Sequence, residues 1–505
     1  MCSAGLREEN DFKNTIIIII MKKRMLFLLL LLAVADTFAL AIERDKYYTI
    51  KSYSDSLAFM ADNEADDDRI ECVGSETSSI YWRFIPTGND NCYYIMNGKT
   101  KRYIQGYTGD KEKITMGTTP VEYHVKSFEE VDGRFYFAAT GYSPHDFTGN
   151  TLGLNLHAES YQADCYVQSY GAVKGANPRS TWTIEEVKLY TMSKDFNGYT
   201  SYIKDTGGSG LAAESGLDNA CLWRLEDAGD DKFYVRNVLT GRYAQACDTT
   251  AEQPVKMGSV PVKYKIKDCS SDEGANNYGL TSADHDNTDF TEGCIGWNLQ
   301  SETHVVQSYA AQSGTNHKSF WVFTEYEPQV IGSAGYATFG STTADAVILG
   351  AQAYKGTAGS SSISLTEVAD VPKDNGVVIQ GSLYAVATAT ASADMSGNSL
   401  KASDGSISGG EGIYALARKD GEVGFYPVAS GVTIPEGKAY LDLGEASVKG
   451  FTFSFDNDDA TAIRNPWVAG GMWSGGESIC NLAGQRMQRL QRGINIVNGR
   501  KVMVK

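Results

Sequence analysis

Proline and catalytic signatures are both scarce in this sequence. Its 505 residues include 11 prolines and six histidines, and the histidines are scattered rather than clustered. We find no G-x-S-x-G nucleophile motif, no H-E-x-x-H zinc motif and no G-x-x-x-x-G-K-S/T phosphate loop. Among the 62 acidic residues, no spacing singles out a carboxylate pair for glycoside hydrolysis. The sequence therefore predicts a protein without catalytic activity, with a hydrolase that lacks a recognisable motif as an alternative.

Metal-binding patterns are also missing. No C-x-x-C pair occurs among the nine cysteines. Eight of them follow residue 41, which is too few for a disulfide scaffold in a chain of this length. Their connectivity is left open by the sequence, with Cys72 and Cys92 as one candidate pair. Three acidic clusters lack the full spacing of a calcium-binding EF-hand loop, so we predict solvated loop charges, no metal and no cofactor. These clusters are Asp66–Asp68, then Asp284, Asp286 and Asp289, and finally Asp456, Asp458 and Asp459.

The charge balance excludes two classes of partner. The formal net charge is -17, and no long run of Lys and Arg reverses it locally. An acidic surface repels phosphate backbones and anionic lipid headgroups. We therefore expect no nucleic acid partner and no role at a membrane surface.

The N-terminal segment has the features of an export signal. Three basic residues follow Met21 and precede an apolar run, which ends in a small-x-small pattern at Ala41. This order is typical of a cleaved secretory signal peptide, which we place at residues 21–41. Residues 1–20 precede the basic segment, so we interpret them as a spurious extension of the reading frame.

Internal repetition organises the middle of the chain. Five fragments occur twice in the same order, and the second copy follows the first by 139 to 141 positions. The pairs are Trp82 with Trp223, Arg102–Gln105 with Arg242–Gln245, Met116–Gly117 with Met257–Gly258, Val167–Tyr170 with Val306–Tyr309, and Trp182 with Trp321. We therefore predict two copies of one module, at residues 42–187 and 188–327.

Each module divides again into three units. An aromatic-x-apolar strand closes every unit, and the first two closing strands are 41 residues apart in both modules. This alternation predicts half-buried strands whose aromatic residue faces inward. The closing strands begin at Trp82, Tyr123 and Trp182, and at Trp223, Tyr264 and Trp321. Threefold repetition of short strands predicts a pseudo-threefold barrel with a hairpin cap.

This pattern resembles the β-trefoil family, in particular ricin-B-type lectin modules, which carry a Q-x-W signature in each third. The resemblance implies a β-trefoil fold and carbohydrate binding, with glycans or glycoproteins as partners. This chain departs from the signature, so the resemblance is stronger for the fold than for the sugar sites of the family. The residues two positions before the four tryptophans are Ile80, Ser180, Cys221 and Ser319.

The third unit of each module carries the candidate ligand-binding residues. Gly153–Leu156 aligns with Gly296–Leu299, where Trp297 stands beside Asn298. An exposed aromatic ring next to an amide suits sugar recognition, whereas an inward-facing Trp297 would be a core residue. The candidates are Asn155, His157, Gln168, Tyr170, Trp297, Asn298, Gln307 and Tyr309. The four tryptophans of the closing strands, Trp82, Trp182, Trp223 and Trp321, are predicted core residues.

Three further regions follow the modules. Residues 328–455 contain short alternating segments separated by turn signals, which predicts a β-sandwich-like domain. Residues 456–478 are interpreted as a linker. Residues 479–505 are predicted to form a small C-terminal β-hairpin, because Asn498–Gly499 stands between two apolar strands. They resemble the C-terminal sorting tail of the type IX secretion route, with an L-x-G-Q-R strand, an N-G turn and a basic, apolar end. That resemblance implies a partner in the outer-membrane secretion machinery.

The sequence thus predicts an all-β protein that is secreted from, or displayed on the outer membrane of, a Gram-negative bacterium. Its predicted function is carbohydrate binding without catalysis. An extracellular protein-binding adhesin or scaffold is the main alternative. Duplication of a whole module favours binding, because two linked weak sites raise the overall affinity.

Overall fold

A computed structural model describes residues 42–455, apart from 55–57, 65–66, 75–76, 128–133, 159–164, 174 and 445–447, and four short segments between residues 479 and 504. It divides the chain into two compact units, residues 1–460 and 461–505. The extension, the signal peptide and the linker predicted from the sequence lie outside the described residues. No described helix is long and apolar enough to cross a membrane.

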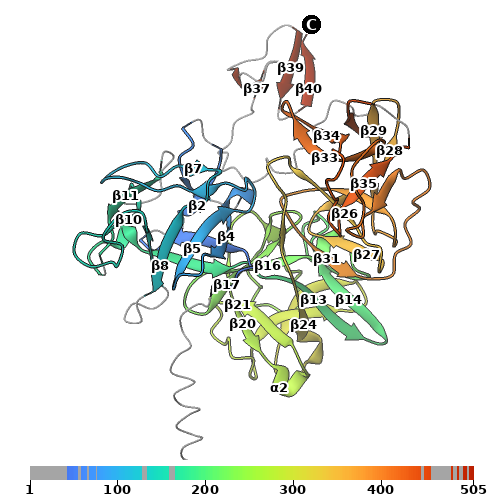
Figure 1. Ribbon diagram of the computed structural model, residues 1–505. Coiled ribbons are helices and arrows are strands. Elements are labelled where there is room, and N and C mark those ends of the chain that lie inside the picture. Colours follow the sequence, from blue (N-terminus) through green and yellow to red (C-terminus); the bar gives the residue numbers. More distant parts are fainter. Residues whose placement is uncertain are drawn as a thin grey trace, which may run out of the picture. The chain divides into compact units, whose positions relative to one another are not determined.

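The first module forms a barrel with a hairpin cap (Figure 1). Six of its strands pair in a closed ring, in the order β1, β4, β5, β8, β9 and β12, and β12 returns to β1. The remaining strands form three hairpins, β2–β3, β6–β7 and β10–β11. The bounds are β1 Tyr48–Ser52, β2 Phe59–Ala61, β3 Glu71–Val73, β4 Tyr81–Pro86, β5 Cys92–Asn97, β6 Tyr103–Ile104, β7 Met116–Gly117, β8 Glu122–Ser127, β9 Phe135–Ala139, β10 Leu152–Leu156, β11 Val167–Gly171 and β12 Trp182–Glu186.

The second module repeats this topology. The ring runs β13, β16, β17, β20, β21, β24 and back to β13, and the hairpins are β14–β15, β18–β19 and β22–β23. A short helix, α2 (Ser270–Glu273), lies between β20 and β21. The bounds are β13 Leu189–Phe196, β14 Tyr199–Lys204, β15 Ala212–Ser215, β16 Trp223–Asp227, β17 Lys232–Asn237, β18 Tyr243–Ala244, β19 Met257–Gly258, β20 Lys263–Asp268, β21 Asn277–Ser282, β22 Ile295–Gln300, β23 Val305–Ala310 and β24 Phe320–Tyr326.

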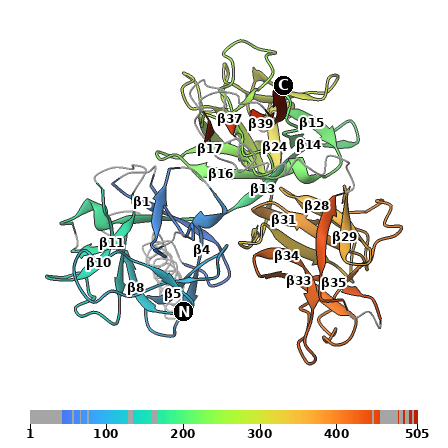
Figure 2. The same ribbon diagram turned by 90° about the horizontal axis from the view of Figure 1, so that it is seen from above.

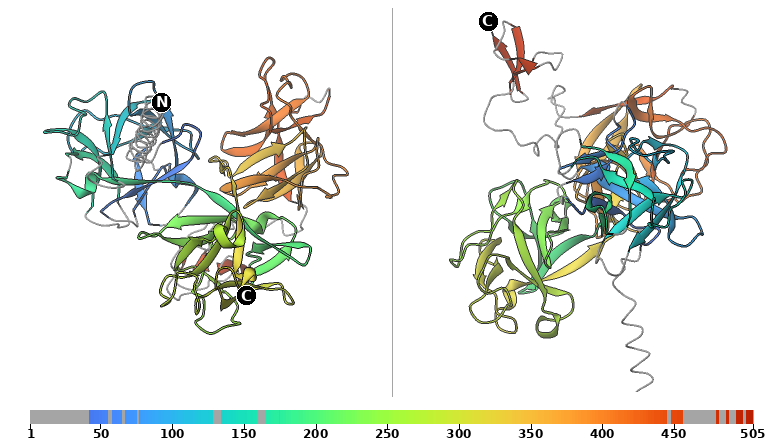
Figure 3. Two further views of the ribbon diagram at one scale, coloured as in Figure 1. Left: turned by 90° about the horizontal axis from the view of Figure 1, so that it is seen from below. Right: turned by 90° about the vertical axis from the view of Figure 1, so that its left-hand side faces the viewer.

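Both modules are therefore β-trefoils, and the predicted all-β fold class is confirmed. In each module, three four-strand units supply two barrel strands and one cap hairpin apiece. The strands of the two modules, coloured blue to teal and green to yellow, can be followed from above and below the first view (Figures 2 and 3).

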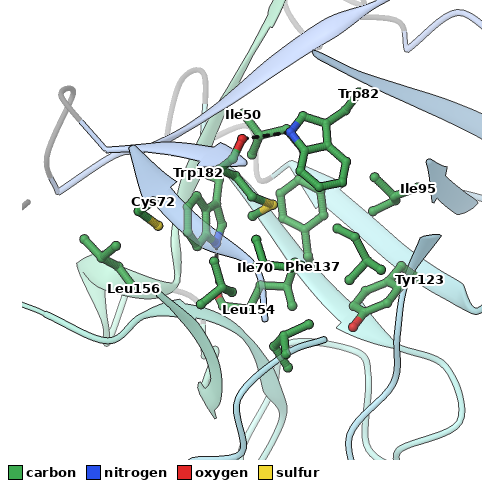
Figure 4. Packing of buried hydrophobic residues seen from close by; sticks show 14 of the residues in the cluster. Ile50, Ile70, Cys72, Trp82, Ile95, Tyr123, Phe137, Leu154, Leu156 and Trp182 are labelled. Carbon is green, nitrogen blue, oxygen red and sulfur yellow. Dashed lines mark hydrogen bonds between the residues drawn. The ribbon is translucent and has the colours of Figure 1, made fainter. Parts of the chain in front are cut away.

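Tryptophans of the closing strands fill the two barrels. Trp82, Trp182, Trp223 and Trp321 are all fully buried. Figure 4 shows Trp82 and Trp182 in the core of the first module, beside Phe137, Leu154 and Leu156. Burying a side chain of this size contributes several kcal/mol, and the indole N–H needs an acceptor inside the core.

Residues 328–455 follow the two modules and form the third region of the first compact unit, residues 1–460. A three-stranded sheet has the order β25-β31-β27, and a nine-stranded sheet has the order β26-β30-β28-β29-β36-β34-β33-β35-β32. Strands β32 and β35 of the long sheet contact β26 and β30, so its two ends pack on one another as in a sandwich. The bounds are β25 Gln329–Val330, β26 Tyr336–Gly340, β27 Ala346–Leu349, β28 Gln352–Ala358, β29 Ser362–Val368, β30 Gly376–Gln380, β31 Leu383–Thr388, β32 Leu400–Ala402, β33 Ile413–Lys419, β34 Glu422–Pro427, β35 Ala439–Asp442 and β36 Phe451–Phe455.

Within the first compact unit, one apolar cluster contains residues from both modules and from residues 328–455, including Tyr81, Leu222 and Leu349. Ile80 and Cys221, which stand where the Q-x-W signature has glutamine, are fully buried in this cluster. Their apolar character is therefore explained by packing between regions, because a buried glutamine amide would need hydrogen-bond partners there.

The second compact unit, residues 461–505, contains a four-stranded sheet of order β38-β37-β39-β40. Strands β39 (Gly493–Val497) and β40 (Arg500–Val504) pair antiparallel in the register Val497 with Arg500, as expected for the predicted C-terminal hairpin. The other strands are β37 (Ile479–Cys480) and β38 (Arg486–Met487).

A glycine sets how closely the third-unit hairpin approaches the barrel. A Cβ atom on Gly153 would lie 2.4 Å from the carbonyl oxygen of Phe137, and one on Gly296 would lie 2.6 Å from that of Leu280. Gly171 is on the same hairpin as Gly153, but a Cβ there would meet nothing within 4 Å. Only the first two positions require glycine for close packing.

We predict that Gly153→Ala lowers the free energy of unfolding by about 1–3 kcal/mol, because the added methyl group must push the hairpin away from β9. Gly171→Ala is the matched control and should change stability by less than about 0.5 kcal/mol. Chemical denaturation of both variants measures the difference. Equal stability of the two variants would contradict the close approach of hairpin and barrel.

Candidate functional site

The third-unit hairpin of the first module brings the four candidates of that module to one face. Strands β10 and β11 place Gly153 opposite Tyr170 and Asn155 opposite Gln168. The ladder continues beyond β10, where the N–H of His157 donates to the carbonyl of Tyr166 at 2.9 Å. Residues two apart on a strand share a face, so Asn155 and His157 on one strand and Gln168 and Tyr170 on the other project from the same side.

A neighbouring segment extends this face. Lys113 lies opposite Gln168 in an antiparallel bridge, and the N–H of Lys111 donates to the carbonyl of Ser169 at 2.7 Å. In this register Lys111 is opposite Tyr170. On the other side, Glu71 of β3 lies opposite Tyr166. We call this set the third-unit face: Lys111, Lys113, Asn155, His157, Tyr166, Gln168 and Tyr170.

The two amides of the third-unit face are held internally. Asn155 is 1% exposed, and its Nδ2 donates to Ser180 Oγ at 2.9 Å. Gln168 is 9% exposed, and its Nε2 donates to Asn155 Oδ1 at 3.2 Å. Ser180 Oγ donates in turn to the carbonyl of Gly171 at 2.8 Å. This chain of bonds fixes the hairpin against the turn before β12, so both amides have a structural role in the geometry.

The rings and cations around these amides are more accessible. His157 is exposed and stacks on Tyr166, with ring centroids 4.1 Å apart and an interplanar angle of 15°. The ammonium of Lys113 and the guanidinium of Arg69 lie 5.5 Å and 5.8 Å from the centroid of the Tyr166 ring. Lys111 lies 5.9 Å from the Tyr170 ring. Cation–π attraction holds such side chains over the rings and orients them.

Two carboxylates balance part of this positive charge. Asp67 accepts a hydrogen bond from Lys113 Nζ at 3.1 Å, and Glu71 accepts one from Arg69 at 3.3 Å. The slight burial of Asp67 raises its pKa, but the hydrogen bonds from Lys113 and from the Arg69 backbone outweigh it, so the pKa is lowered overall. Asp67 therefore stays ionised beside Lys113 at neutral pH.

The second module keeps the centre of this face and changes its surroundings. Gly296 is opposite Tyr309 and Asn298 is opposite Gln307, and Asn298 Nδ2 donates to Ser319 Oγ at 2.8 Å. Around this shared centre, the charged and aromatic residues of the first module are replaced. Arg69, Glu71, Lys111, Lys113, His157 and Tyr166 correspond to Gly210, Ala212, Glu252, Pro254, Gln300 and Val305. The two faces are therefore alike in framework and different in chemistry.

Trp297 does not contribute an exposed ring. Its side chain is fully buried in the core of the second module, at a centroid distance of 5.5 Å from Tyr264 in an edge-to-face arrangement. Cys247 lies in the same core, where burial raises the pKa of its thiol to about 12. Of the two roles that the sequence left open, the structure places Trp297 in the core, since alternate residues of β22 face opposite sides and Trp297 falls on the inner side.

The first third of each module contains a buried carboxylate that the sequence did not predict. Asp62 is fully buried, and Arg102 Nε donates to its Oδ2 at 3.0 Å. Arg102 and the Thr100 hydroxyl bind the remaining positions of the carboxylate, and these hydrogen bonds to Asp62 raise the pKa of Arg102 above its ordinary value. The second module repeats this clamp with Asp205, Thr240 and Arg242. Hydrogen-bond donors of the same module occupy both carboxylates, so Asp62 and Asp205 have a structural role.

Neither the histidines nor the acidic loops form a reactive cluster in the described part of the chain. No group of three or more His, Cys, Asp or Glu side chains among the described residues could hold a metal ion. His285 bonds to the carbonyl of Cys247 at 3.1 Å, and His124 bonds to that of His145 at 2.8 Å. Asp66 and the cluster at Asp456, Asp458 and Asp459 lie outside the described residues.

No protein-family model and no curated protein matches the sequence. Among solved structures, a ricin B-like lectin from Macrolepiota procera in complex with lactose is 19% identical over 28% of this chain and 97% of its own, with a TM-score of 0.24. The Rhizoctonia solani agglutinin is 18% identical over 29% of this chain and 99% of its own, with a TM-score of 0.25. The hemolytic lectin CEL-III is 7% identical over 72% of this chain and 97% of its own, with a TM-score of 0.37. At these values the β-trefoil assignment rests on the strand pairing, not on the superpositions.

We predict that Trp297→Ala lowers the free energy of unfolding by about 3–5 kcal/mol, because it leaves a large cavity in the second barrel. Trp297→Leu is the matched variant and should be milder, since Leu154 occupies the equivalent position in the first module. Thermal melting monitored by circular dichroism compares the two. A Trp297→Ala protein with unchanged stability would show that this ring lies outside the core.

Asp205→Asn should destabilise the second module by about 3 kcal/mol, because it leaves the Arg242 guanidinium without its charged partner. Asp231→Asn provides the control, since the Asp231 side chain is 93% exposed and should contribute less than about 0.5 kcal/mol. Denaturant titration measures both. A similar small effect of the two substitutions would argue against the clamp.

Proposed function

We propose that this chain is an exported carbohydrate-binding protein with no catalytic activity of its own, and that the third-unit faces of its two modules bind the ligand. The observation that carries the proposal is the repeated arrangement of a partly exposed tyrosine beside a buried amide pair whose asparagine is hydrogen-bonded internally. Tyr170 with Asn155 and Gln168 provides it in the first module. Tyr309 with Asn298 and Gln307 provides it in the second.

This arrangement suits saccharides for a physical reason. The C–H faces of a sugar ring are apolar and pack on aromatic rings, while its hydroxyl groups need fixed polar partners. A hairpin that is already held by internal hydrogen bonds loses little conformational entropy when a ligand arrives. The stacked pair of His157 and Tyr166 adds a second flat surface in the first module.

The two faces favour different ligands. Lys111 and Lys113 border the first face, and Glu252 and Pro254 take their places in the second. A saccharide that carries carboxylate or sulfate groups is therefore favoured at the first module and disfavoured beside Glu252. Two linked modules raise the overall affinity for a glycan surface that displays both kinds of saccharide.

Export and surface display also belong to this proposal. They are supported by the basic, apolar and small-residue order of residues 21–41 and by the resemblance of residues 479–505 to a type IX sorting tail. The main competing function is a protein-binding adhesin, and a hydrolase without a recognisable motif is the second.

We predict that the mature chain, residues 42–505, binds at least one saccharide class on a glycan array. Tyr170→Ala should weaken binding to the first module about tenfold, equal to about 1.4 kcal/mol, because it removes a partly exposed ring from the face. The measurement is titration calorimetry with the best array ligand. Tyr199→Ala is the matched control, because Tyr199 is 72% exposed and lies on β14, outside the third-unit face.

The melting temperature of Tyr170→Ala should stay close to that of the unchanged protein. Full binding by a folded Tyr170→Ala variant would remove the third-unit face from the proposal. A blank array with a well-folded sample would favour the adhesin instead, and release of reducing sugar from an array ligand would favour the hydrolase.

A further inference from the structure

Two cysteines of the first module meet where the first-unit and third-unit hairpins lie side by side. Glu71 of β3 and Tyr166 form an antiparallel bridge. The next residues in this register are Cys72 and Cys165, and the N–H of Cys72 donates to the carbonyl of Cys165 at 3.0 Å. Cys72 is therefore directly opposite Cys165, although 93 positions separate them in the sequence.

The geometry of this pair suits a covalent bond between the two sulfur atoms. Directly opposite residues that share a backbone hydrogen bond have Cα atoms about 5.5 Å apart. Disulfides need Cα separations of about 4.4–6.8 Å and side chains that point the same way. Both side chains point into the barrel core, since Cys72 is 5% and Cys165 is 2% exposed and both belong to the same apolar cluster. Figure 4 shows Cys72 beside Leu156 in this core.

The second module shows that the fold itself does not require cysteine here. The N–H of Ala213 donates to the carbonyl of His304 at 2.7 Å, which is the bond that Cys72 and Cys165 make in the first module. Both cysteines are therefore replaced together in the other copy. Retention or loss of the two as a pair is expected when each is useful only with the other.

No other two described cysteines lie opposite each other on paired strands. Cys269 and Cys294 share an apolar cluster of the second module, but neither lies on a strand. Cys92 lies on β5 opposite His124, whereas Cys72 lies on β3 between Met60 and Cys165, so the strand pairing does not bring together the Cys72–Cys92 pair considered from the sequence. Cys221 and Cys247 are also buried. Burial raises the pKa of each of these two thiols to about 12, which makes them poor nucleophiles for disulfide exchange.

We propose that Cys72 and Cys165 are joined by a disulfide bond in the exported protein. The bond forms by thiol–disulfide exchange with a disulfide-donor protein of an oxidising compartment. One cysteine thiolate attacks the donor disulfide and forms a mixed disulfide, and the second thiolate then displaces the donor sulfur. The two cysteines lose two protons and two electrons in all, and the donor is released as a dithiol.

The cross-link would also act on the third-unit face. Cys165 directly precedes Tyr166, and Cys72 directly follows Glu71, so the bond fixes the strands that carry these residues. The disulfide points into the core while Tyr166 and Glu71 project from the opposite side of their strands. This consequence for ligand binding rests on the proposed carbohydrate binding, whereas the cross-link itself rests only on the proposed export.

The direct test is peptide mapping of the mature chain, residues 42–505, after secretion into an oxidising compartment. The unreduced protein is denatured, its thiols are alkylated and its peptides are analysed by mass spectrometry. We expect one linked pair that contains Cys72 and Cys165, and alkylated Cys92, Cys221 and Cys247. Alkylation of both Cys72 and Cys165, or linkage of either to another cysteine, would overturn the proposal.

A second measurement tests how much the cross-link contributes to the stability of the protein. Reductant should lower the melting temperature of the unchanged protein by about 5–10 °C, because the unfolded chain regains the entropy of a long loop. The double variant Cys72→Ala with Cys165→Ala should melt at the same temperature with and without reductant, and Cys92→Ala should keep the full response. An unchanged protein that ignores reductant would overturn the proposal, whether or not any glycan binds.

Discussion

Four indole N–H groups connect the caps of this protein to its barrels, and most of the architecture depends on them. Trp82 and Trp182 donate to the carbonyls of Met60 and Leu154 at 2.9 Å. Trp223 donates to Ile203 at 2.9 Å, and Trp321 donates to Trp297 at 3.4 Å. In each case the tryptophan stands on a barrel strand and the acceptor on a cap hairpin. Because a buried indole without an acceptor is unfavourable, each hairpin is held in one register over the core.

This constraint explains why the Q-x-W pattern is altered without loss of the fold. Ser180 and Ser319 stand two residues before their tryptophans, and each hydroxyl accepts the amide of an asparagine on the third-unit hairpin. The short serine side chain lets the turn before the tryptophan lie close to the hairpin. The longer side chain of a glutamine would push the hairpin away. In the first units the same position is buried against other regions, so Ile80 and Cys221 are apolar there. The packing around each third of a module thus determines which residue stands two positions before its tryptophan.

The repeat made the barrel strands predictable, because their alternation of buried and exposed residues is local. Trp82 and Phe84 are buried while Arg83 between them is not, as the pattern indicated. The equivalent strand of the second module departs from the pattern, since Arg224 is buried and Leu225 is only partly buried. The inward direction of Trp297 was not predictable, since an aromatic residue on a short hairpin satisfies either face. Tyr166 was missed for another reason. Its importance comes from contacts with His157 and Lys113, and Val305 replaces it in the second module, so no repeat marks it.

Contacts between hairpins were the least predictable part of the molecule. The clamp of Asp62 by Arg102 joins residues 40 positions apart, and the meeting of Cys72 with Cys165 spans two units. No local pattern encodes such pairs, because they arise only when the threefold cap closes. Once the strand register is known, comparison of the two modules distinguishes residues that maintain the hairpins from residues that can determine ligand preference. Residues present in both copies, such as Asn155 and Asn298, hold the hairpins, and residues present in one copy are free to set ligand preference. Ligand specificity is therefore expected to depend on the differences between the modules rather than on their repeats.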